Sequence, residues 1–414
     1  MGFLSRAVAE QKSYSTLDLF REIYGGRATS SSDQTVTLAT AIEVSAVFSC
    51  NRVIGNGMAQ VPLKLLRESA DGKTKMPAKD HPLYKVLSVK PNRWQTSFQW
   101  RQMLSWHVEL CGNHFSFINR VFGNIKELHP FQPGQVEVIE LDNGDLAYDV
   151  TAKNGSKQRF PQESILHIRG PSWDGVSGLD VIKIAREAVG LSLASEQSAA
   201  SLHKNGVNTS GVYSVEGSLN KDQHASLTKW IEDTSSGSKN AGKPLILDRA
   251  AKWISTQMSG VDAQALETRK YQIEEICRFH GVMPIMAGYS DKAATYASAE
   301  QMFLAHIQHC LAPRWTNYEQ AFDAMLLTEK ERDSGLFTNF TEEGMIRGSI
   351  KDTKDTILGY VNGGILTPDE GRALLDRNPI GDDASGKLRI PANIVGTLPD
   401  AETPQKGADN GINA

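Results

Sequence analysis

The chain has 414 residues, of which 40% are hydrophobic and 22% are charged, and its formal net charge is -4. This composition excludes a disordered chain and predicts a soluble protein of two or three domains, at the usual ~100–200 residues per domain. No apolar run approaches the ~18 residues of a membrane span, and residues 1–15 lack the apolar core of a signal peptide. The near-neutral charge also argues against a protein that grips nucleic acid tightly, because tight binders neutralise many phosphates.

Residues 1–40 are polar and small, which predicts a flexible N-terminal arm. Residues 41–177 favour a mixed α/β region, with one helix over 41–58 and another after Pro91. Apolar residues then alternate along several short strands, as in an antiparallel sheet. Three turn dipeptides separate these strands: Gly123-Asn124, Asn143-Gly144 and Asn154-Gly155. Asn-Gly is typical of the type I′ hairpin turn, in which both central residues need a positive φ.

Residues 178–206 predict a helix, because apolar side chains recur at helical spacing from Leu179 to Leu193. The helix then continues with small residues, which favour close packing against a second helix: Ala194, Ser198, Ala199 and Ser201. From the spacing alone, a helix buried within one domain is the favoured interpretation. Residues 207–258 predict a small β-α-β-β unit, with strands over 211–215, 245–247 and 253–258 and a helix over 220–233.

Residues 259–281 predict a second helix, which ends at Gly281. A loop over 282–297 follows, and then a long helix over 298–328. Pro313 lies within this long helix and lacks a backbone N–H, so we expect a kink near residues 309–313. Residues 329–390 predict a small helical unit, in which Thr367-Pro368 is a favourable helix start. Residues 391–414 predict a disordered tail.

Motifs for catalysis or metal binding are weak. Residues 237–244 match a phosphate-binding P-loop from Gly237 to Lys243, but Pro244 replaces the Ser or Thr that binds Mg²⁺. The predicted helix precedes this segment and the strand follows it, whereas a P-loop needs the reverse order, so an exposed loop is the better interpretation. A metal site is a further hypothesis, although core packing explains its residues better: Cys277, His280, His306, His309 and Cys310. The four cysteines include no CxxC pair, which favours a reducing compartment. The sequence therefore predicts no catalytic residue, cofactor or metal.

Seven segments, in this order and spacing, resemble one known family. They are PNRWQTSF at 91–98, GNHFSFINR at 112–120, LHPFQP at 128–133, FPQESILHIRG at 160–170, GLDVIKIAREA at 178–188, LETRKYQIEEICRFHGV at 266–282 and NGGILTPDEGRA at 362–373. On these segments the chain resembles the portal proteins of tailed bacteriophages, the head-to-tail connectors of long-tailed phages. The resemblance extends over residues ~45–385.

This resemblance implies an α+β portal fold. It implies a mixed α/β wing at 41–177, a two-helix stem at 178–206 and 259–281, and a β-α-β-β clip at 207–258. A tunnel loop at 282–297, a long kinked wing helix at 298–328 and a helical crown at 329–390 complete the expected organisation.

The implied function is a ring, normally a dodecamer, at the unique capsid vertex of a virion assembled in the bacterial cytoplasm. Double-stranded DNA would pass through it, without sequence specificity, in packaging, retention and ejection. The other implied partners are the large terminase, the major capsid protein, the scaffold and head-completion or adaptor proteins, with no membrane. The alternatives are a nucleotide-dependent DNA enzyme that uses Lys243 and a ring adaptor elsewhere in the virion.

Two groups of site residues follow from the resemblance. The tunnel loop would present Met286, Tyr289, Ser290, Asp291, Lys292 and Tyr296 to DNA. The clip would dock the packaging motor through Lys221, Lys229, Trp230, Lys239 and Lys243. Residues 328–414 carry 15 acidic and 10 basic side chains, so the rest of the chain is close to neutral. Because each phosphate contact adds affinity, a near-neutral channel wall would let a duplex slide.

Overall fold

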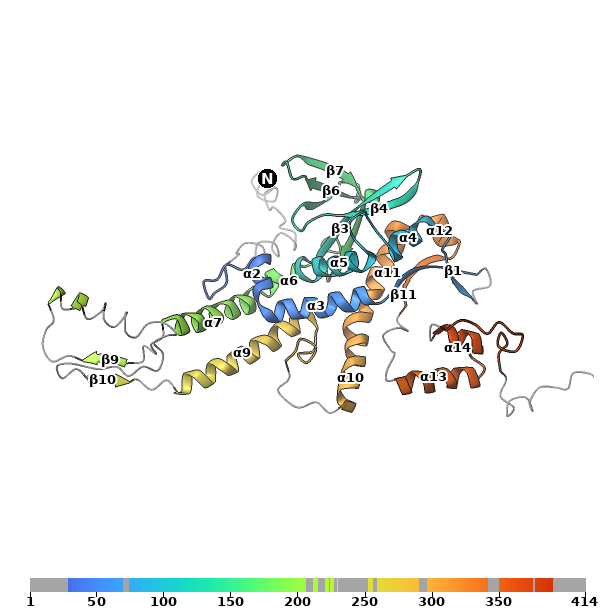
Figure 1. Cartoon of the computed structure of the whole chain (residues 1–414). Helices are drawn as coiled ribbons and strands as arrows, with labels where there is room; N and C mark the ends of the chain where they lie inside the picture. Colours follow the sequence, from blue (N-terminus) through green and yellow to red (C-terminus); the bar gives the residue numbers. More distant parts are fainter. Residues whose placement is uncertain are drawn as a thin grey trace, which may run out of the picture. The chain divides into compact units, whose positions relative to one another are not determined.

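The computed structural model divides into two compact units, residues 1–341 and 342–414 (Figure 1). It describes residues 29–69, 74–205, 211–214, 220–222, 224–226, 229, 252–255, 259–289, 296–341, 350–374 and 377–389. The predicted tail at 391–414 and most of the predicted arm at 1–40 lie outside these ranges. Within the described ranges, no helix is both long and apolar enough to cross a membrane.

The first unit is built on helices α3 (Ser45–Gln60) and α5 (Ser97–Cys111), which pack against each other. A short helix, α2 (Leu38–Glu43), precedes α3, and the extended backbone of Val44 separates the two. The single helix predicted over 41–58 is therefore two helices. Gly55 lets α5 approach closely, because a Cβ at Gly55 would lie 2.6 Å from the indole nitrogen of Trp106.

One three-stranded sheet pairs strands from the beginning and the end of this unit's sequence. Its central strand, β1 (Leu63–Glu68), pairs antiparallel with β2 (Lys75–Pro77) and with β11 (Leu336–Phe340). Helix α4 (Pro82–Ser88) packs against β1, and the short helix α12 (Glu329–Asp333) leads into β11. Residues 329–341, which we grouped with the C-terminal part from sequence, therefore belong to the first unit because β11 completes the sheet around β1.

Two further three-stranded antiparallel sheets confirm the predicted antiparallel region. One has the order β4-β3-β8 and the other the order β5-β6-β7. The bounds are β3 (Asn113–Val121), β4 (Asn124–Pro130), β5 (Val136–Glu140), β6 (Leu146–Thr151), β7 (Lys157–Pro161) and β8 (Ile165–Arg169), with a 3-10 turn at Gln162–Ser164. Strand β3 packs against α5, and β8 packs against α11 (Ala312–Leu326).

The predicted position is wrong at the β3–β4 hairpin, and the predicted type I′ turn is wrong at the two Asn-Gly hairpins. In the β3–β4 hairpin the central residues are Phe122 and Gly123, with φ of 51° and 81°, so the turn lies one residue before the predicted dipeptide. At the other two hairpins only the glycines, Gly144 and Gly155, have positive φ. There the Leu141 N–H donates to the Asp145 carbonyl across a three-residue loop, and Ala152 bonds Ser156 likewise. These are type I turns with a glycine bulge, the next commonest hairpin connection.

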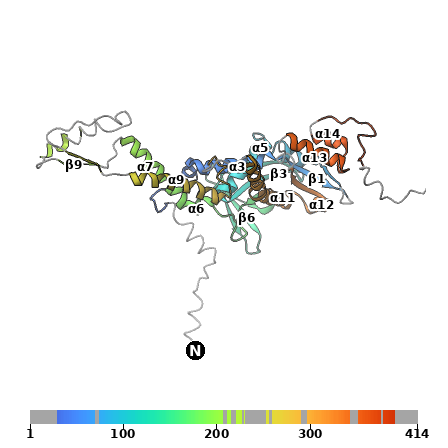
Figure 2. The same ribbon diagram turned by 90° about the horizontal axis from the view of Figure 1, so that it is seen from below.

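The unit also contains two helices that lie side by side in both views, α7 (Arg186–Asn205) and α9 (Ser259–His280) (Figures 1 and 2). The helix predicted over 178–206 begins as a separate turn, α6 (Val181–Ile184), which Asp180 caps. Between α7 and α9, strands β9 (Gly211–Ser214) and β10 (Lys252–Ser255) pair antiparallel. The predicted strand at 245–247 lies outside the described residues.

A backbone contact positions the start of α6. The Gly178 N–H donates to the Oδ1 of Asn113, and the Gly170 N–H donates to the carbonyl of Gly112. A Cβ at Gly178 would lie 1.9 Å from the Gly112 carbonyl oxygen, so no larger residue fits this crossing. The strand β3 thereby fixes where the helical segment begins.

The second unit contains α13 (Ile350–Asn362) and α14 (Pro368–Leu374), which pack together. The helix start predicted at Thr367 is confirmed: the Glu370 N–H donates to the Thr367 hydroxyl, and the Thr367 N–H donates to the Glu370 carboxylate. Asp369 then accepts hydrogen bonds from the backbone of Ile380 and Gly381 and from the Ser385 hydroxyl. These bonds fasten the following segment to α14.

Candidate functional site

The candidate site is the junction at which α9 ends and the next helical run begins. Helix α9 stops at Gly281, whose φ is 64°, and the Val282 N–H donates to the Cys277 carbonyl. Residues 283–289 then form consecutive tight turns, in which the Tyr289 N–H donates to the Pro284 carbonyl at 3.0 Å. The first half of the predicted loop at 282–297 is thus compact backbone with half-buried side chains.

The predicted tunnel-loop residues are only partly described. Met286 and Tyr289 lie in the compact turns and are half-buried. Tyr296 is the first residue of the next helix. Ser290, Asp291 and Lys292 lie outside the described residues. The structure therefore does not bring the six residues together as one described surface.

The predicted long helix at 298–328 is interrupted. Helix α10 (Tyr296–His306) passes into a π-helical turn (Ile307–Leu311), which passes into α11 (Ala312–Leu326). The Ala312 N–H donates to the Ile307 carbonyl, five residues earlier. Pro313 follows directly and has no N–H to donate to the preceding turn. The wider turn coincides with the kink predicted at 309–313, while the bend angle itself stays a prediction.

Arg314 joins three helical segments at this junction. Its guanidinium donates two hydrogen bonds to the carboxylate of Glu109 on α5, at 2.7 and 2.9 Å. It also donates to the carbonyl of His280 at the end of α9 and to the carbonyl of Cys310 in the π turn. Burial lowers the pKa of Arg314, but the bonds and charge of Glu109 outweigh burial and hold that pKa above its ordinary value. Arg314 is therefore fully protonated.

The candidate metal ligands are distributed among separate contacts. Cys277 contacts Cys50, the Sγ of Cys310 accepts a hydrogen bond from Arg314, and His309 is exposed. His280 and His306 are buried, and burial lowers the pKa of each. No group of three or more His, Cys, Asp or Glu residues in the described ranges could hold a metal ion.

Helix α10 exposes apolar side chains. Phe303 is 59% exposed and Leu304 is 41% exposed. The neighbouring Met302 is half-buried. The segment from Tyr296 to Leu311 contains no Lys or Arg. A helix that is apolar on several faces is ordinarily buried. Its main packing partner in the described part of the chain is the π turn that continues it.

The predicted packing residues of α7 lie on two faces. The contact with α9 uses neighbouring positions: the Gln272 amide donates to the Ser195 hydroxyl at 3.4 Å, and Arg269 lies 4.0 Å from Glu196. Ala194 and Ala199 are half-buried, whereas Ser198 and Ser201 are exposed. The small side chains at 198 and 201 therefore remain open along α7.

The predicted motor-docking residues are mostly outside the described residues. Lys221 and Lys229 are helical and exposed. Trp230, Lys239 and Lys243, and with them the P-loop-like segment at 237–244, fall outside the described ranges.

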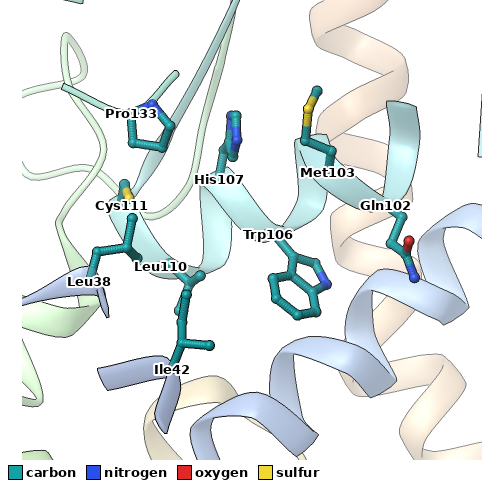
Figure 3. Close-up of a pocket in the computed structure, with 9 residues that line it drawn as sticks. All are labelled: Leu38, Ile42, Gln102, Met103, Trp106, His107, Leu110, Cys111 and Pro133. Carbon is teal, nitrogen blue, oxygen red and sulfur yellow. The ribbon is translucent and has the colours of Figure 1, made fainter. Parts of the chain in front are cut away.

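An apolar pocket of about 380 Å³ lies between α2 and α5 (Figure 3). It is lined by Leu38, Ile42, Gln102, Met103, Trp106, His107, Leu110, Cys111 and Pro133. His107 in its wall contacts the buried His114, with 3.1 Å between their Nδ1 atoms, and His114 contacts Ser116. Burial lowers the pKa of His107 to about 4. An apolar lining and a neutral imidazole favour packing over catalysis.

Sequence reasoning missed the Arg314–Glu109 pair and this histidine cluster. Both could have been suspected from charged or polar residues that lie within the apolar stripe of a predicted helix. Glu109 lies between Val108 and Leu110 in the stripe of α5, and a charge there requires a partner when buried.

The comparisons assign the class of protein. The family model described as phage portal protein matches residues 45–376, so the chain belongs to the phage portal protein family. Members of this family are head-to-tail connectors, which are structural components of the virion neck rather than enzymes. The resemblance seen in the sequence is thereby confirmed.

Two phage proteins that are similar in sequence to this chain are also described as portal proteins. The chain is 28% identical over 394 residues to the probable portal protein of Streptomyces phage phiC31, covering 91% of this chain and 84% of the relative. It is 24% identical over 379 residues to the portal protein of Enterobacteria phage HK97, covering 88% and 87%.

Two solved structures share the fold. One is from the neck of a native gene transfer agent particle computed with C12 symmetry, with a TM-score of 0.56, 23% identity and coverage of 87% of this chain and 98% of that chain. The other is an HK97-family phage portal protein from Corynebacterium diphtheriae, with a TM-score of 0.55, 13% identity and coverage of 75% and 96%.

Proposed function

We propose that twelve copies of this chain form a ring at one capsid vertex and that double-stranded DNA passes through it without sequence specificity. The ring would serve packaging, retention and ejection of the genome. Membership of the portal family over residues 45–376 is the observation that carries this proposal. The C12 symmetry of the similar gene transfer agent neck supports the ring number.

The exposed apolar surface of α10 supports assembly. Phe303 and Leu304 would be covered by a neighbouring copy, since apolar side chains gain ~25 cal/mol per Å² on leaving water. DNA is a poor alternative cover, because its phosphates attract Lys and Arg and residues 296–311 contain neither. In a ring, each subunit presents one face to one neighbour and a different face to the other.

The open small residues of α7 support the same arrangement. Ser198 and Ser201 would allow a helix of the adjacent subunit to approach closely around the axis. We therefore assign α7 and α9, at 178–206 and 259–281, to the stem. The strand pair β9–β10 within 207–258 would form the clip, and its edges would pair between subunits.

The remaining assignments complete the proposal. Residues 41–177 form the wing, 282–297 the tunnel loop, 298–328 the kinked wing helix and 329–390 the crown, of which 329–341 lie in the first unit. The clip would dock the large terminase and later the head-completion proteins through the residues Lys221, Lys229, Trp230, Lys239 and Lys243. The wing would contact the major capsid protein and scaffold.

The ring is tested by electron microscopy and native mass spectrometry of the purified chain. We expect twelve-fold rings with a duplex-wide bore for the wild type. The double substitution Phe303→Ser and Leu304→Ser should shift the protein to monomers that keep the far-UV circular dichroism of the wild type. Phe122→Ser is the matched control, because Phe122 is 98% exposed at a hairpin tip and should leave rings intact. Monomers for the wild type would contradict the ring, and intact rings in the double variant would remove α10 from the interface.

The tunnel loop is tested in particles. A ring of Lys292 would attract phosphate and a ring of Asp291 would offset that attraction, so the loop would hold DNA weakly. Asp291→Asn should increase the DNA retained in heads, and Lys292→Gln should decrease it. Unchanged packaging and retention in both variants would contradict a role for these residues while leaving the ring intact.

A further inference from the structure

Two buried cysteines from distant parts of the chain lie in contact. Cys50 on α3 and Cys277 on α9 are both completely buried, and their Sγ atoms are 3.7 Å apart. The Cys50 thiol donates a hydrogen bond to the Cys277 sulfur. The two residues are separated by 227 positions, so a bond between them would join α3 directly to α9.

The helices around this pair are held together by packing. Val47, one turn before Cys50, and Ile276, next to Cys277, belong to the same buried apolar cluster. A disulfide has an S–S distance of ~2.05 Å, so the sulfurs must approach by about 1.7 Å.

The hydrogen bond makes the two thiols differ in acidity. The pKa of Cys277 is lowered, chiefly because its sulfur accepts the hydrogen bond from Cys50, although burial opposes this. The pKa of Cys50 is raised, first by donating that bond and then by burial. Since the thiolate is the reactive form, the direction of the hydrogen bond between the two sulfurs favours Cys277 as the nucleophile and Cys50 as the resolving thiol.

We propose that Cys50 and Cys277 are an oxidation site, at which hydrogen peroxide converts the two thiols into a disulfide that fastens α9 to α3. The Cys277 thiolate attacks one peroxide oxygen, the O–O bond breaks, and hydroxide leaves, giving a sulfenic acid. The Cys50 sulfur then attacks the Cys277 sulfur, the S–O bond breaks, and the leaving hydroxide takes the Cys50 proton. Two thiols and one peroxide give one disulfide and two waters.

The other two cysteines lack these features. Burial raises the pKa of Cys310 to about 11 and that of Cys111 to about 12. Cys310 accepts a hydrogen bond from Arg314, and Cys111 lies at the end of α5. They therefore serve as internal controls for selective oxidation.

The disulfide would restrain the helix that leads into the turns at 283–289. A reducing cell keeps such a pair as thiols, so the subunit would assemble with α9 unrestrained. A particle outside the cell has no such thiol pool, and peroxide would then lock α9 onto the wing-side helix α3. This is a property of one subunit and stands independently of the ring.

The test is peroxide treatment of the purified full chain, followed by alkylation and non-reducing peptide mapping. We expect one linked peptide that joins Cys50 to Cys277, with Cys111 and Cys310 recovered as alkylated thiols. The melting temperature should rise by roughly 5 °C, because the crosslink closes a long loop in the unfolded chain. A reducing agent should reverse both changes.

Variants separate the site from general oxidation. Cys50→Ala should abolish the link and the rise in melting temperature and leave Cys277 as a sulfinic acid, whereas Cys111→Ala should keep both. The wild-type experiment needs no variant, so a variant that fails to fold leaves it decisive. Recovery of both thiols unmodified, a link to Cys310, or a link between subunits would each overturn the proposal.

Discussion

Arg314 is the residue on which the junction of α5, α9 and the π turn depends. Its guanidinium is largely buried, with a side chain 22% exposed, and the Glu109 side chain is only 9% exposed. Removing one member of a buried ion pair leaves an uncompensated charge, which costs ~3–5 kcal/mol. Each further bond from Arg314, to His280 and Cys310, adds to what a substitution removes.

We predict that Arg314→Met and Glu109→Leu each lower the free energy of unfolding by about 3–5 kcal/mol. The double variant should lose less than the sum, because neither charge is then left alone. Urea denaturation of the three variants completes the cycle. The exposed pair Arg67–Asp80 is the control, and Arg67→Met should change the free energy of unfolding little. Additive losses at Arg314 and Glu109 would show that the pair does not act as a unit.

The sequence predicts neither partner of this pair. Glu109 and Arg314 are 205 positions apart, and local patterns carry no information about which distant residues meet. Pro313 was informative at this junction, because a residue without an N–H must disturb the helical hydrogen bonds wherever it lies within a helix. In the structure this disturbance is the π turn at Ile307–Leu311. A proline within a helix predicts a π turn and a simple bend equally, so the sequence does not distinguish them.

Among the elements, the hairpins show what local sequence does and does not determine. The strands were predicted from alternation, but Asn143 and Asn154 are not in the positive-φ conformation that a type I′ turn needs. Their side-chain oxygens instead accept hydrogen bonds from the N–H groups of Asp145 and Ser156, two residues on. Asn is suited to both turns, so the dipeptide predicts a hairpin without its loop length. Strand β11 was missed because its partner β1 lies far away in the sequence.

The β3–β4 hairpin contains a residue in an unfavourable conformation. Phe122 has a φ of 51°, and its side chain is 98% exposed, so it gains little from packing. We predict that Phe122→Asn stabilises the first unit by about 0.5–1 kcal/mol, because Asn tolerates the left-handed region far better. Thermal denaturation measures this. Phe122→Ala keeps the strain and should match the wild type, and a loss of stability in Phe122→Asn would mean that the ring contributes contacts.

At the scale of the whole molecule, the first unit contains a group of buried, neutral histidines that couples its stability to pH. The ring of His167 packs on that of Phe115, with 4.3 Å between the ring centroids. His167 also forms hydrogen bonds with the Tyr148 hydroxyl and with Asn113. His107 and His114 continue the group toward α5. Burial lowers the pKa of His167 to about 3 and that of His107 to about 4, and holds the pKa of His114 well below its ordinary value. Folding therefore keeps these side chains deprotonated.

The unfolded chain binds protons at these histidines below pH ~6.5, whereas the folded chain does so only near the lowered values. Between about pH 4 and 6.5 the unfolded state binds more protons, so the free energy of unfolding falls as the pH falls, by up to about 1.4 kcal/mol per pH unit for each histidine. We predict a clear loss of stability in urea denaturation from pH 7.5 to pH 5. His167→Gln keeps hydrogen-bonding groups but removes one titrating site, so its loss over this range should be smaller. An equal loss in both proteins would show that His167 does not carry the pH dependence.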